Sequence, residues 1–123
     1  MNNLSKKVTV IVCVRNGEDT IRQCIESILS NEPFEIIVVD GNSRDNTVDV
    51  CMKYNLKILQ DEGVGLGNAR NLGLKNVITE YVYYVGPDNI LEKNSIHNLV
   101  SYSLKKKWIG VSPLVQIHKS NDS

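Results

Sequence analysis

Two runs of β-branched, apolar residues most constrain the fold of this chain. They read VTVIVCV at 8–14 and FEIIVVD at 34–40. Neither run alternates with polar residues, which is typical of strands covered on both faces. The segment 18–30 between them has one apolar helical stripe, formed by Ile21, Cys24, Ile25, Ile28 and Leu29. A strand, a helix and a second buried strand predict a parallel pair joined by a crossover.

The same alternation continues along the chain. Helical patterns at 43–55, 65–77 and 92–107 alternate with strand patterns at 56–60, 81–85 and 108–117. These helices would place Met52 and Leu104 on their inward faces. We therefore predict the α/β class, as a three-layer α/β/α Rossmann-like sheet of about five mostly parallel strands with right-handed crossovers. A length of 123 residues predicts one domain over 1–123.

The charge balance excludes one class of partner. The chain has 14 lysines and arginines and 14 aspartates and glutamates, so we expect no long-range field that attracts nucleic acid. No segment approaches the roughly 20 apolar residues of a transmembrane helix, and the N-terminus lacks a signal-peptide pattern. We therefore expect a cytoplasmic protein. Three cysteines without a CxxC pair are interpreted as small core residues, Cys13, Cys24 and Cys51.

Polar residues follow three of the predicted strands, as RNGED, DGNSRDN and GPDN. Because ligands of open α/β sheets bind beyond the carboxyl ends of the strands, we expect these loops to share one rim. Turn chemistry alone is an alternative explanation for each loop. Together the loops place Asp40, Asp45 and Asp88 on that rim, and clustered carboxylates suit Mg²⁺ or Mn²⁺ shared with substrate phosphates.

Dinucleotide and P-loop chemistry are disfavoured by the glycine pattern. Asp40 follows the second strand, where a dehydrogenase keeps its ribose-binding acid, but the first loop supplies only Gly17 instead of GxGxxG. The later segment GVGLGNARNLG matches neither that fingerprint nor GxxxxGK. Its glycines, among them Gly67 and Gly73, suggest close approach of another group.

Four segments together resemble the nucleotide-binding half of family 2 glycosyltransferases of the GT-A fold. They are VTVIVCVRNGEDTIRQCIESIL, FEIIVVDGNSRDNT, GLGNARNLGLKN and EYVYYVGPDNIL, and the resemblance covers roughly residues 7–115. It implies binding of a nucleotide-diphosphate sugar with a divalent metal and inverting transfer of a glycosyl group to an acceptor.

The resemblance also implies site residues. Asn16 keeps the asparagine of the family's Pro-Thr-Tyr-Asn loop, and Arg15 is expected to contact a phosphate or stack on a base. Asp40 matches the first acid of Asp-Asp-Gly-Ser and is expected to accept hydrogen bonds from base or ribose, while Gly41 replaces the second acid. Asn42 fits the rest of that loop, and Ser43 or Asp45 is expected to cap the next helix.

Two further positions complete the nucleotide site that the resemblance implies. Arg70 matches the arginine of Ala-Arg-Asn-x-Gly and is expected beside the diphosphate, with a surface ion pair as the alternative. Asp88 matches the second acid of the Asp-x-Asp metal motif and is the expected metal ligand, whereas Gly86 replaces the first acid. Gly65, Gly67 and Gly73 are expected where the backbone passes close to ligand or to the fourth strand.

The catalytic residue is not identified. The resemblance places the catalytic carboxylate after the fifth strand, and family members need roughly another hundred residues for acceptor binding, so we expect a truncated chain without the acceptor-binding half. His97 and His118 are interpreted as surface residues. The alternative function is a non-catalytic remnant or interaction domain, which Gly41 and Gly86 favour. A homo-oligomer through an exposed sheet edge is a further hypothesis.

Overall fold

Strands and helices alternate along the chain, as the sequence predicts. The structure is a computed structural model and describes residues 3–63, 65–106 and 116–119. The elements are η1 (Leu4–Lys7, a 3-10 helix), β1 (Val8–Val14), α1 (Ile21–Leu29), β2 (Glu35–Asp40), α2 (Thr47–Cys51), β3 (Lys57–Gln60), α3 (Leu66–Lys75), β4 (Tyr81–Val85), α4 (Ser95–Lys106) and β5 (Gln116–Lys119).

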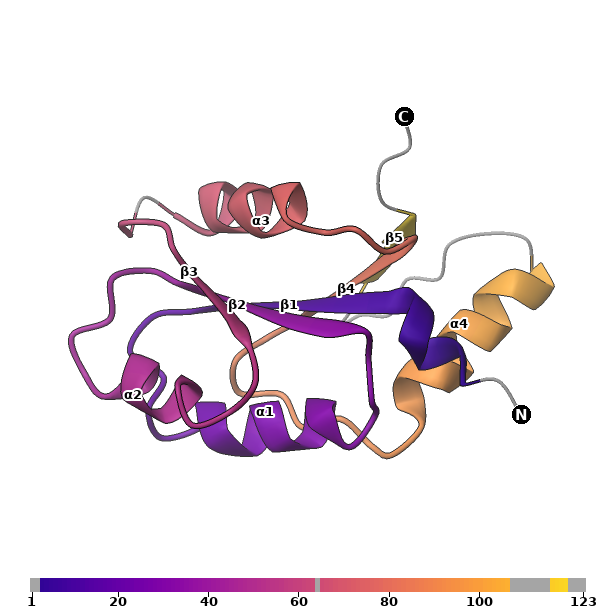
Figure 1. Cartoon of the computed structure of the whole chain (residues 1–123), viewed down its shortest axis with the longest axis horizontal. Coiled ribbons are helices and arrows are strands. Elements are labelled where there is room, and N and C mark those ends of the chain that lie inside the picture. The colour runs from indigo at the N-terminus through magenta and orange to yellow at the C-terminus, as the bar shows by residue number, and fades with distance from the viewer. Residues whose placement is uncertain (1–2, 64, 107–115, 120–123) are drawn as a thin grey trace.

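The strands form one sheet in the order β3-β2-β1-β4-β5. Four of them, β1 to β4, are parallel, and β5 pairs antiparallel with β4. The register sets Val14 beside Asp40, and Asp40 beside Gln60, at the ends of β1, β2 and β3. The loops that follow these three strands therefore leave the sheet at one edge, on the left in Figure 1.

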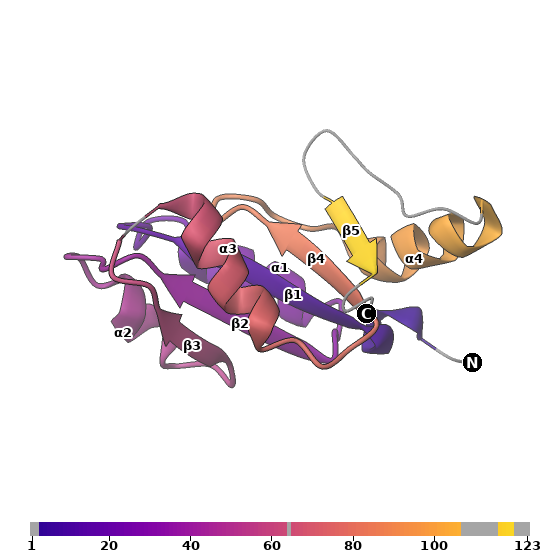
Figure 2. The same cartoon turned by 90° about the horizontal axis from the view of Figure 1, so that it is seen from above.

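Helices cover both faces of the sheet. In Figures 1 and 2, α3 lies on one face, and α1 and α2 lie on the other. A hydrophobic core lies on each face of the sheet. Alternate residues of β1 pack into one core or the other, because successive side chains of a strand point to opposite faces. Val10 and Val12 pack with Ile25 of α1, and Ile11 packs with Ala69 of α3. The middle of β1 and of β2 is apolar on both faces, as expected where helices cover both sides of the sheet.

Helix α3 packs closely on the sheet at Gly73. A Cβ atom on Gly73 would lie 3.0 Å from Ile11 Cγ2 and 3.3 Å from Val39 Cγ2. A Cβ atom on Gly67 would meet nothing within 4 Å. The expectation of close approach is therefore confirmed for Gly73, but the neighbours are β1 and β2 instead of β4. At Gly67 the helix faces open space.

The structure corrects some details of the sequence interpretation. Met52 is 68% exposed and Leu104 is 49% exposed, although both were expected on inward faces. Helix α2 ends at Cys51, so Met52 is its C-cap and no longer belongs to the helical stripe. The predicted strand 108–117 lies mostly outside the described residues, and only its last two positions fall in β5.

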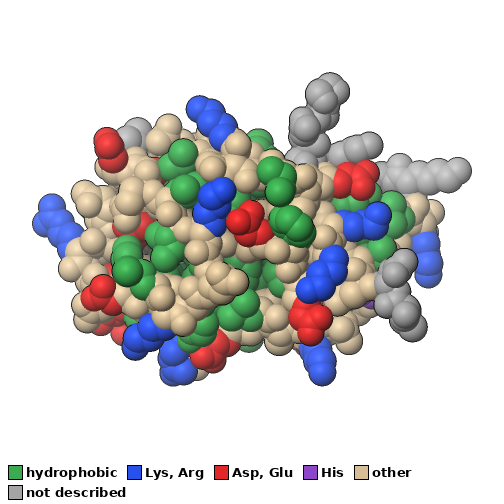
Figure 3. All heavy atoms as spheres, viewed as in Figure 1, with side chains coloured by type: hydrophobic (Ala, Val, Ile, Leu, Met, Phe, Trp, Pro, Cys, Tyr) green, Lys and Arg blue, Asp and Glu red, His purple; other side chains and the backbone are tan. Residues whose placement is uncertain are grey.

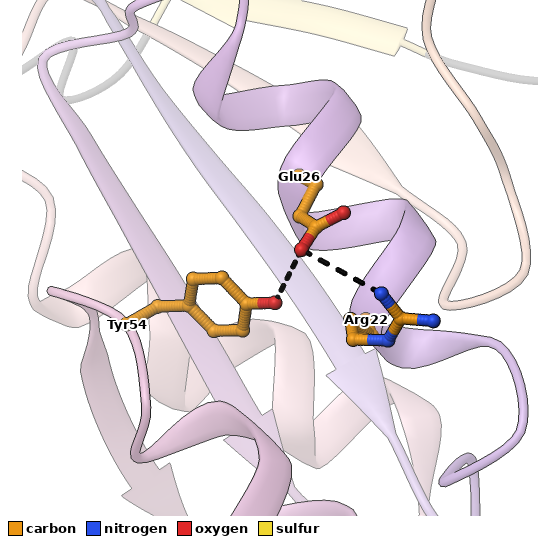
Figure 4. Close-up of polar contacts among 3 residues, drawn as sticks. All are labelled: Arg22, Glu26 and Tyr54. Atoms are coloured by element: carbon orange, nitrogen blue, oxygen red, sulfur yellow. Dashed lines mark hydrogen bonds and ion pairs between the residues drawn. The ribbon is translucent and has the colours of Figure 1, made fainter.

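A polar contact joins α1 to the segment after α2 (Figure 4). The hydroxyl of Tyr54 donates a hydrogen bond of 2.7 Å to Glu26 Oε2, and Arg22 Nη1 lies 3.9 Å from the same oxygen. The Arg22–Glu26 pair is exposed and has i,i+4 spacing, so it adds little stability. Helices α1 and α2 are held together mainly by the burial of Ile21, Ile25 and Cys51 in one hydrophobic core.

Charged side chains are dispersed over the surface. On the face drawn in Figure 3, acidic and basic groups are interspersed and no extended basic area is seen. Among the described residues, no helix is long and apolar enough to cross a membrane.

Candidate functional site

The loops after β1, β2 and β3 have unusual backbone conformations. Among the described residues, five non-glycine positions have positive φ, and three of them are Asn16 at 55°, Asn42 at 66° and Glu62 at 65°. Each follows one of these strands. Positive φ costs energy for a residue with a side chain, and such positions concentrate at functional sites. This edge of the sheet is therefore the first candidate site.

Hydrogen bonds connect the loops after β1 and β2 in both directions. The amide of Asn16 donates to Ser43 Oγ at 2.8 Å, and Asn16 Oδ1 accepts from the amide of Arg44 at 2.8 Å. The amide of Gly17 donates to Thr47 Oγ1 at 2.8 Å, and Glu18 Oε1 accepts from the amide of Asn46 at 2.8 Å. Asn16 thus positions the second loop, with its side-chain oxygen already engaged.

Asp45 belongs to the same network and serves the start of α2. Its Oδ1 accepts from the amide of Thr47, the first residue of α2, at 3.0 Å, and from the Thr47 hydroxyl. Its Oδ2 accepts from the amide of Glu18 at 3.2 Å. The hydrogen bond from the Thr47 side chain is the main cause that lowers the pKa of Asp45 below its ordinary value. The expected capping role is met only in part, because the N-cap residue of α2 is Asn46, whose side chain makes no capping hydrogen bond, and Asp45 precedes it.

The carboxylate of Asp40 is buried within the second loop. Its side chain is 1% exposed, its Oδ2 accepts from the amide of Ser43 at 3.1 Å, and its Oδ1 accepts from the Ser43 hydroxyl. Asp40 is not among the residues that line the pocket described next. Its contacts are those of a residue that shapes the loop.

A pocket of about 190 Å³ opens at this edge, between the strand ends and the N-terminus of α3. Arg15 and Gly41 line it from the first two loops, Asp61 and Gly63 from the third, and Leu66 from α3. The remaining lining residues are Cys13, Val14, Val39, Gly65 and Ala69. Most of this wall is apolar. Arg15 and Asp61 bring the opposite charges.

Arg70 lies beside the pocket on α3. Its guanidinium carbon is 5.2 Å from the centre of the Tyr84 ring, so it stacks over an aromatic face of β4. Burial raises the pKa of the Cys13 thiol to about 11, and the positive charge of Arg70 opposes this shift. Cys13 is therefore a neutral, half-buried pocket residue at physiological pH. The sequence interpretation had assigned it to the core.

The turn after β4 holds Asp88 at the surface. The amide of Asn89 donates to the carbonyl of Gly86 at 3.1 Å, and Thr20 Oγ1 donates to the carbonyl of Pro87 at 3.1 Å. A Cβ atom on Gly86 would lie 2.6 Å from Asn89 Oδ1. The side-chain amide of Asn89 thus occupies the space that the side chain of an acid at position 86 would need. Asp88 is exposed.

The residues that the structure describes fit a divalent ion only in part. They contain no group of three histidine, cysteine, aspartate or glutamate side chains that could hold a metal. The expected cluster of Asp40, Asp45 and Asp88 is therefore not formed, because hydrogen bonds within the loops engage the first two. Asp88 is exposed and its carboxylate has no hydrogen bond to a described residue. One carboxylate suffices for Mg²⁺ only when phosphates and water supply the other ligands.

The structure brings some of the predicted site residues together and leaves others apart. Arg15 lines the pocket, Arg70 lies beside it and Asp88 stands on the turn after β4. Asn42 is exposed on the second loop, with its Cβ 3.6 Å from a Cβ atom placed on Gly63.

Sequence reasoning missed two polar residues at this edge, Asp61 and Asn89. Asp61 is the first residue after β3, so the same strand-end rule could have found it. Asn89 lies within the quoted GPDN turn, but its contact with position 86 needs the folded turn to be seen.

Comparisons with known proteins agree on one family. The model of Glycosyl transferase family 2 matches residues 9–122. Glycosyltransferase GlyA of Streptococcus pneumoniae is 35% identical over an alignment of 100 residues that covers 76% of this chain and 14% of that protein. The poly(ribitol-phosphate) beta-N-acetylglucosaminyltransferase TarP of Staphylococcus aureus is 31% identical over an alignment of 107 residues that covers 79% of this chain and 33% of that protein. The chain spans about a third or less of these relatives.

Solved structures agree with the fold. TarS 1–349 of S. aureus, in complex with UDP-GlcNAc, has a TM-score of 0.72 and 30% identity, covering 80% of this chain and 31% of that one. The mannosyltransferase PcManGT of Pyrobaculum calidifontis, in complex with GDP-Man and Mn²⁺, has a TM-score of 0.73 and 24% identity, covering 79% of this chain and 32% of that one. These likenesses confirm the expected Rossmann-like fold of GT-A type.

Proposed function

Because the chain belongs to glycosyl transferase family 2, we propose that it forms the donor-binding part of a glycosyltransferase that uses a nucleotide-diphosphate sugar. The observation that carries this proposal is the pocket at the carboxyl ends of β1, β2 and β3. Ligands bind at this position in open α/β sheets. The similarity to TarS, which was solved with UDP-GlcNAc, supports the same class of donor.

The charged residues at this edge suit the phosphates of such a donor. Arg15 lines the pocket and Arg70 lies at its side, so both guanidinium groups can approach a diphosphate placed between the pocket and β4. Arginine binds phosphate through several donors in a fixed plane, which favours this role over a surface ion pair. Asn16, Asp40 and Asn42 support the donor by fixing the shape of the two loops.

Asp88 is the residue that we assign to a divalent metal. Its carboxylate is exposed, on the turn that follows β4, and is the hard oxygen ligand that Mg²⁺ or Mn²⁺ prefers. When bound with the donor, the metal would neutralise charge on the leaving diphosphate. Transfer to an acceptor also needs a general base, which we assign to no described residue.

A thermal-shift experiment tests this proposal. We expect UDP- or GDP-sugars with Mn²⁺ to raise the melting temperature of the chain by several degrees, because a ligand at 100 times its Kd stabilises a fold by about 2.7 kcal/mol. Asp88→Ala should remove the metal-dependent part of the shift. Glu92→Ala is the matched control, since it removes an exposed carboxylate shortly after the same strand.

Three outcomes are informative. Stabilisation that needs Mn²⁺ and Asp88 supports the donor site as described. Stabilisation by nucleotide without metal supports the alternative of a binding domain that keeps the fold without the chemistry, as Gly41 and Gly86 suggest. No stabilisation by any of the common nucleotide sugars contradicts the proposal.

A further inference from the structure

The segment that joins β4 to α4 runs along α1 (Figure 1). This connection spans residues 86–94 and contains the turn that carries Asp88. The backbone amides and carbonyls of such a segment need hydrogen-bond partners. Polar side chains along α1 and at its ends supply partners, and their spacing of three or four residues is that of neighbours on one side of a helix. We call them the α1 stripe: Thr20, Cys24, Ser27 and Asn31.

The first half of the α1 stripe holds the two residues that precede Asp88. Thr20 Oγ1 donates to the carbonyl of Pro87 at 3.1 Å, and the Cys24 thiol donates to the carbonyl of Gly86 at 3.4 Å. Burial raises the pKa of this thiol to about 12, and the nearby negative charge of Asp88 adds to the shift. The thiol therefore keeps its proton at physiological pH and remains a hydrogen-bond donor.

The second half of the α1 stripe holds the rest of the connection and the start of α4. Ser27 Oγ accepts from the amide of Leu91 at 3.0 Å. Asn31 Nδ2 donates to the carbonyl of Glu92 at 3.1 Å, and Asn31 Oδ1 accepts from the amide of Ile96 at 3.0 Å. Asn31 is 3% exposed, and loss of hydrogen bonds to a buried side chain is costly. The connection is thus fixed to α1 along its length.

Thr20 does not cap the helix that it begins. It is the N-cap residue of α1, a position where threonine usually accepts a hydrogen bond from an amide of the first turn. Here its side chain makes no capping hydrogen bond. Its hydroxyl is directed to Pro87, which is 67 positions further along the chain. Helix capping therefore does not explain Thr20, whereas a role in holding the Asp88 turn does.

We propose that Thr20 and Cys24 are positioning residues for Asp88, which hold its turn on α1 so that the carboxylate is in place before a divalent metal binds. This inference rests on the donor site proposed above, in which Asp88 binds the metal. It adds that residues of α1 strengthen metal-dependent nucleotide binding without contacting metal or nucleotide. A ligand group that is already held in position loses less conformational entropy on binding, which matters most where the protein supplies a single carboxylate.

Thr20→Val is the informative variant. It removes the hydroxyl, keeps a side chain of similar shape, and sacrifices no capping hydrogen bond. Thr20 is exposed, so we expect the variant to fold, whereas replacement of the buried Cys24 would also disturb the core. Thr20→Ser keeps the hydroxyl. Ser30→Ala is the matched control, because the Ser30 hydroxyl donates to the carbonyl of Ser27 within the same helix.

Calorimetric titration with UDP and with GDP, each in Mn²⁺ and in EDTA, tests the inference. In Mn²⁺ we expect Thr20→Val to bind the tighter of the two nucleotides at least about 3-fold more weakly than wild type, which is the usual effect of one lost hydrogen bond. In EDTA the two proteins should bind it equally. Thr20→Ser and Ser30→Ala should match wild type under both conditions.

Amide hydrogen exchange of the free chain provides a second measurement. The amide of Asn89 donates to the carbonyl of Gly86 within the turn, and it should exchange at least about 3-fold faster in Thr20→Val than in wild type or Ser30→Ala.

Two results would overturn the inference and leave the donor site standing. One is an unchanged affinity of Thr20→Val in Mn²⁺ or an unchanged exchange rate of the Asn89 amide. The other is an equal loss of affinity in Mn²⁺ and in EDTA, which would mean that Thr20 contacts the nucleotide itself. Absence of Mn²⁺-dependent binding to wild type would overturn the inference together with the metal role of Asp88.

Discussion

Asp45 and Asp61 show how the same residue type has different uses at one edge of the sheet. Asp45 has both carboxylate oxygens engaged by Thr47 and by the amide of Glu18, whereas Asp61, in the wall of the pocket, has one oxygen without a hydrogen bond to any residue that the structure describes. In the sequence both are aspartates in a predicted loop after a strand, which turn chemistry explains equally well. Only the folded contacts show that Asp45 binds the first residue of α2 and that Asp61 lines the pocket.

The contacts of Asp45 predict a pH-dependent part of the stability. Its folded-state pKa lies below the ordinary value of an aspartate, so the ionised form stabilises the fold above that ordinary value. This contribution is lost as the pH falls through the folded pKa. Asp45→Asn should therefore lower the melting temperature at neutral pH, and the difference from wild type should shrink as the solution is acidified.

Melting temperatures between pH 7 and strongly acidic pH measure this effect. Asp19→Asn is the matched control, because Asp19 is exposed in the neighbouring loop and its carboxylate accepts no hydrogen bond from a described residue. We expect its melting temperature to run parallel to that of wild type. A difference for Asp45→Asn that stays constant over the whole pH range would contradict the assigned hydrogen bonds.

At the scale of elements, strand and helix periodicity predicted the architecture well. The buried strands β1 and β4 have the predicted bounds, because continuous β-branched or aromatic runs are hard to accommodate elsewhere. Helix α2 is shorter than its pattern, ending at Cys51, and so Met52 is exposed. Strand β5 pairs with β4 in antiparallel orientation. This pairing joins residues far apart in the sequence, so the periodicity of the sequence could not predict it.

Two glycines in α3 predict opposite effects of one substitution. Gly67→Ala should raise the free energy of unfolding by up to about 1 kcal/mol, because the added methyl group faces open space and alanine favours a helix. Gly73→Ala should lower it below the wild-type value, because the methyl group would press on the buried Ile11 and Val39 and such overpacking costs about 1–3 kcal/mol. Urea denaturation followed by circular dichroism measures both. Equal stability of the two variants would mean that α3 does not pack on the sheet at Gly73.

At the scale of the whole molecule, the family and the fold could be predicted because four short segments occur in the right order around a recognisable sheet. The structure has a pocket at the edge where the site was predicted, and the strand-end rule could point there because it depends only on topology. Which side chains face the pocket could not be predicted in the same way. Asp40 ends β2 and Asp61 directly follows the adjacent β3, yet only Asp61 lines the pocket, and this depends on the hydrogen bonds that each loop makes.

The open sheet predicts weak self-association. The outer strands are β3 and β5, and the outward backbone groups of each have no further strand to pair with among the described residues. Both strands have four residues, and short edges limit such pairing. We expect light scattering to give the monomer mass in dilute solution and a rising average mass as the concentration increases. A monomer mass at every concentration would contradict pairing through these edges.

The reciprocal hydrogen bonds between 16–18 and 43–47 limit how this protein can be re-engineered. A chimera that replaces only the first of these loops can lose the side-chain acceptors Asn16 Oδ1 and Glu18 Oε1, which bind amides of the second loop. A chimera that replaces only the second can lose Ser43 Oγ and Thr47 Oγ1, which bind amides of the first loop. Each single graft therefore leaves polar groups of the recipient without hydrogen-bond partners, which lowers the stability of the fold. Exchange of the two segments as a pair keeps every partner, so these loops are transferable in this scaffold only as a two-loop unit.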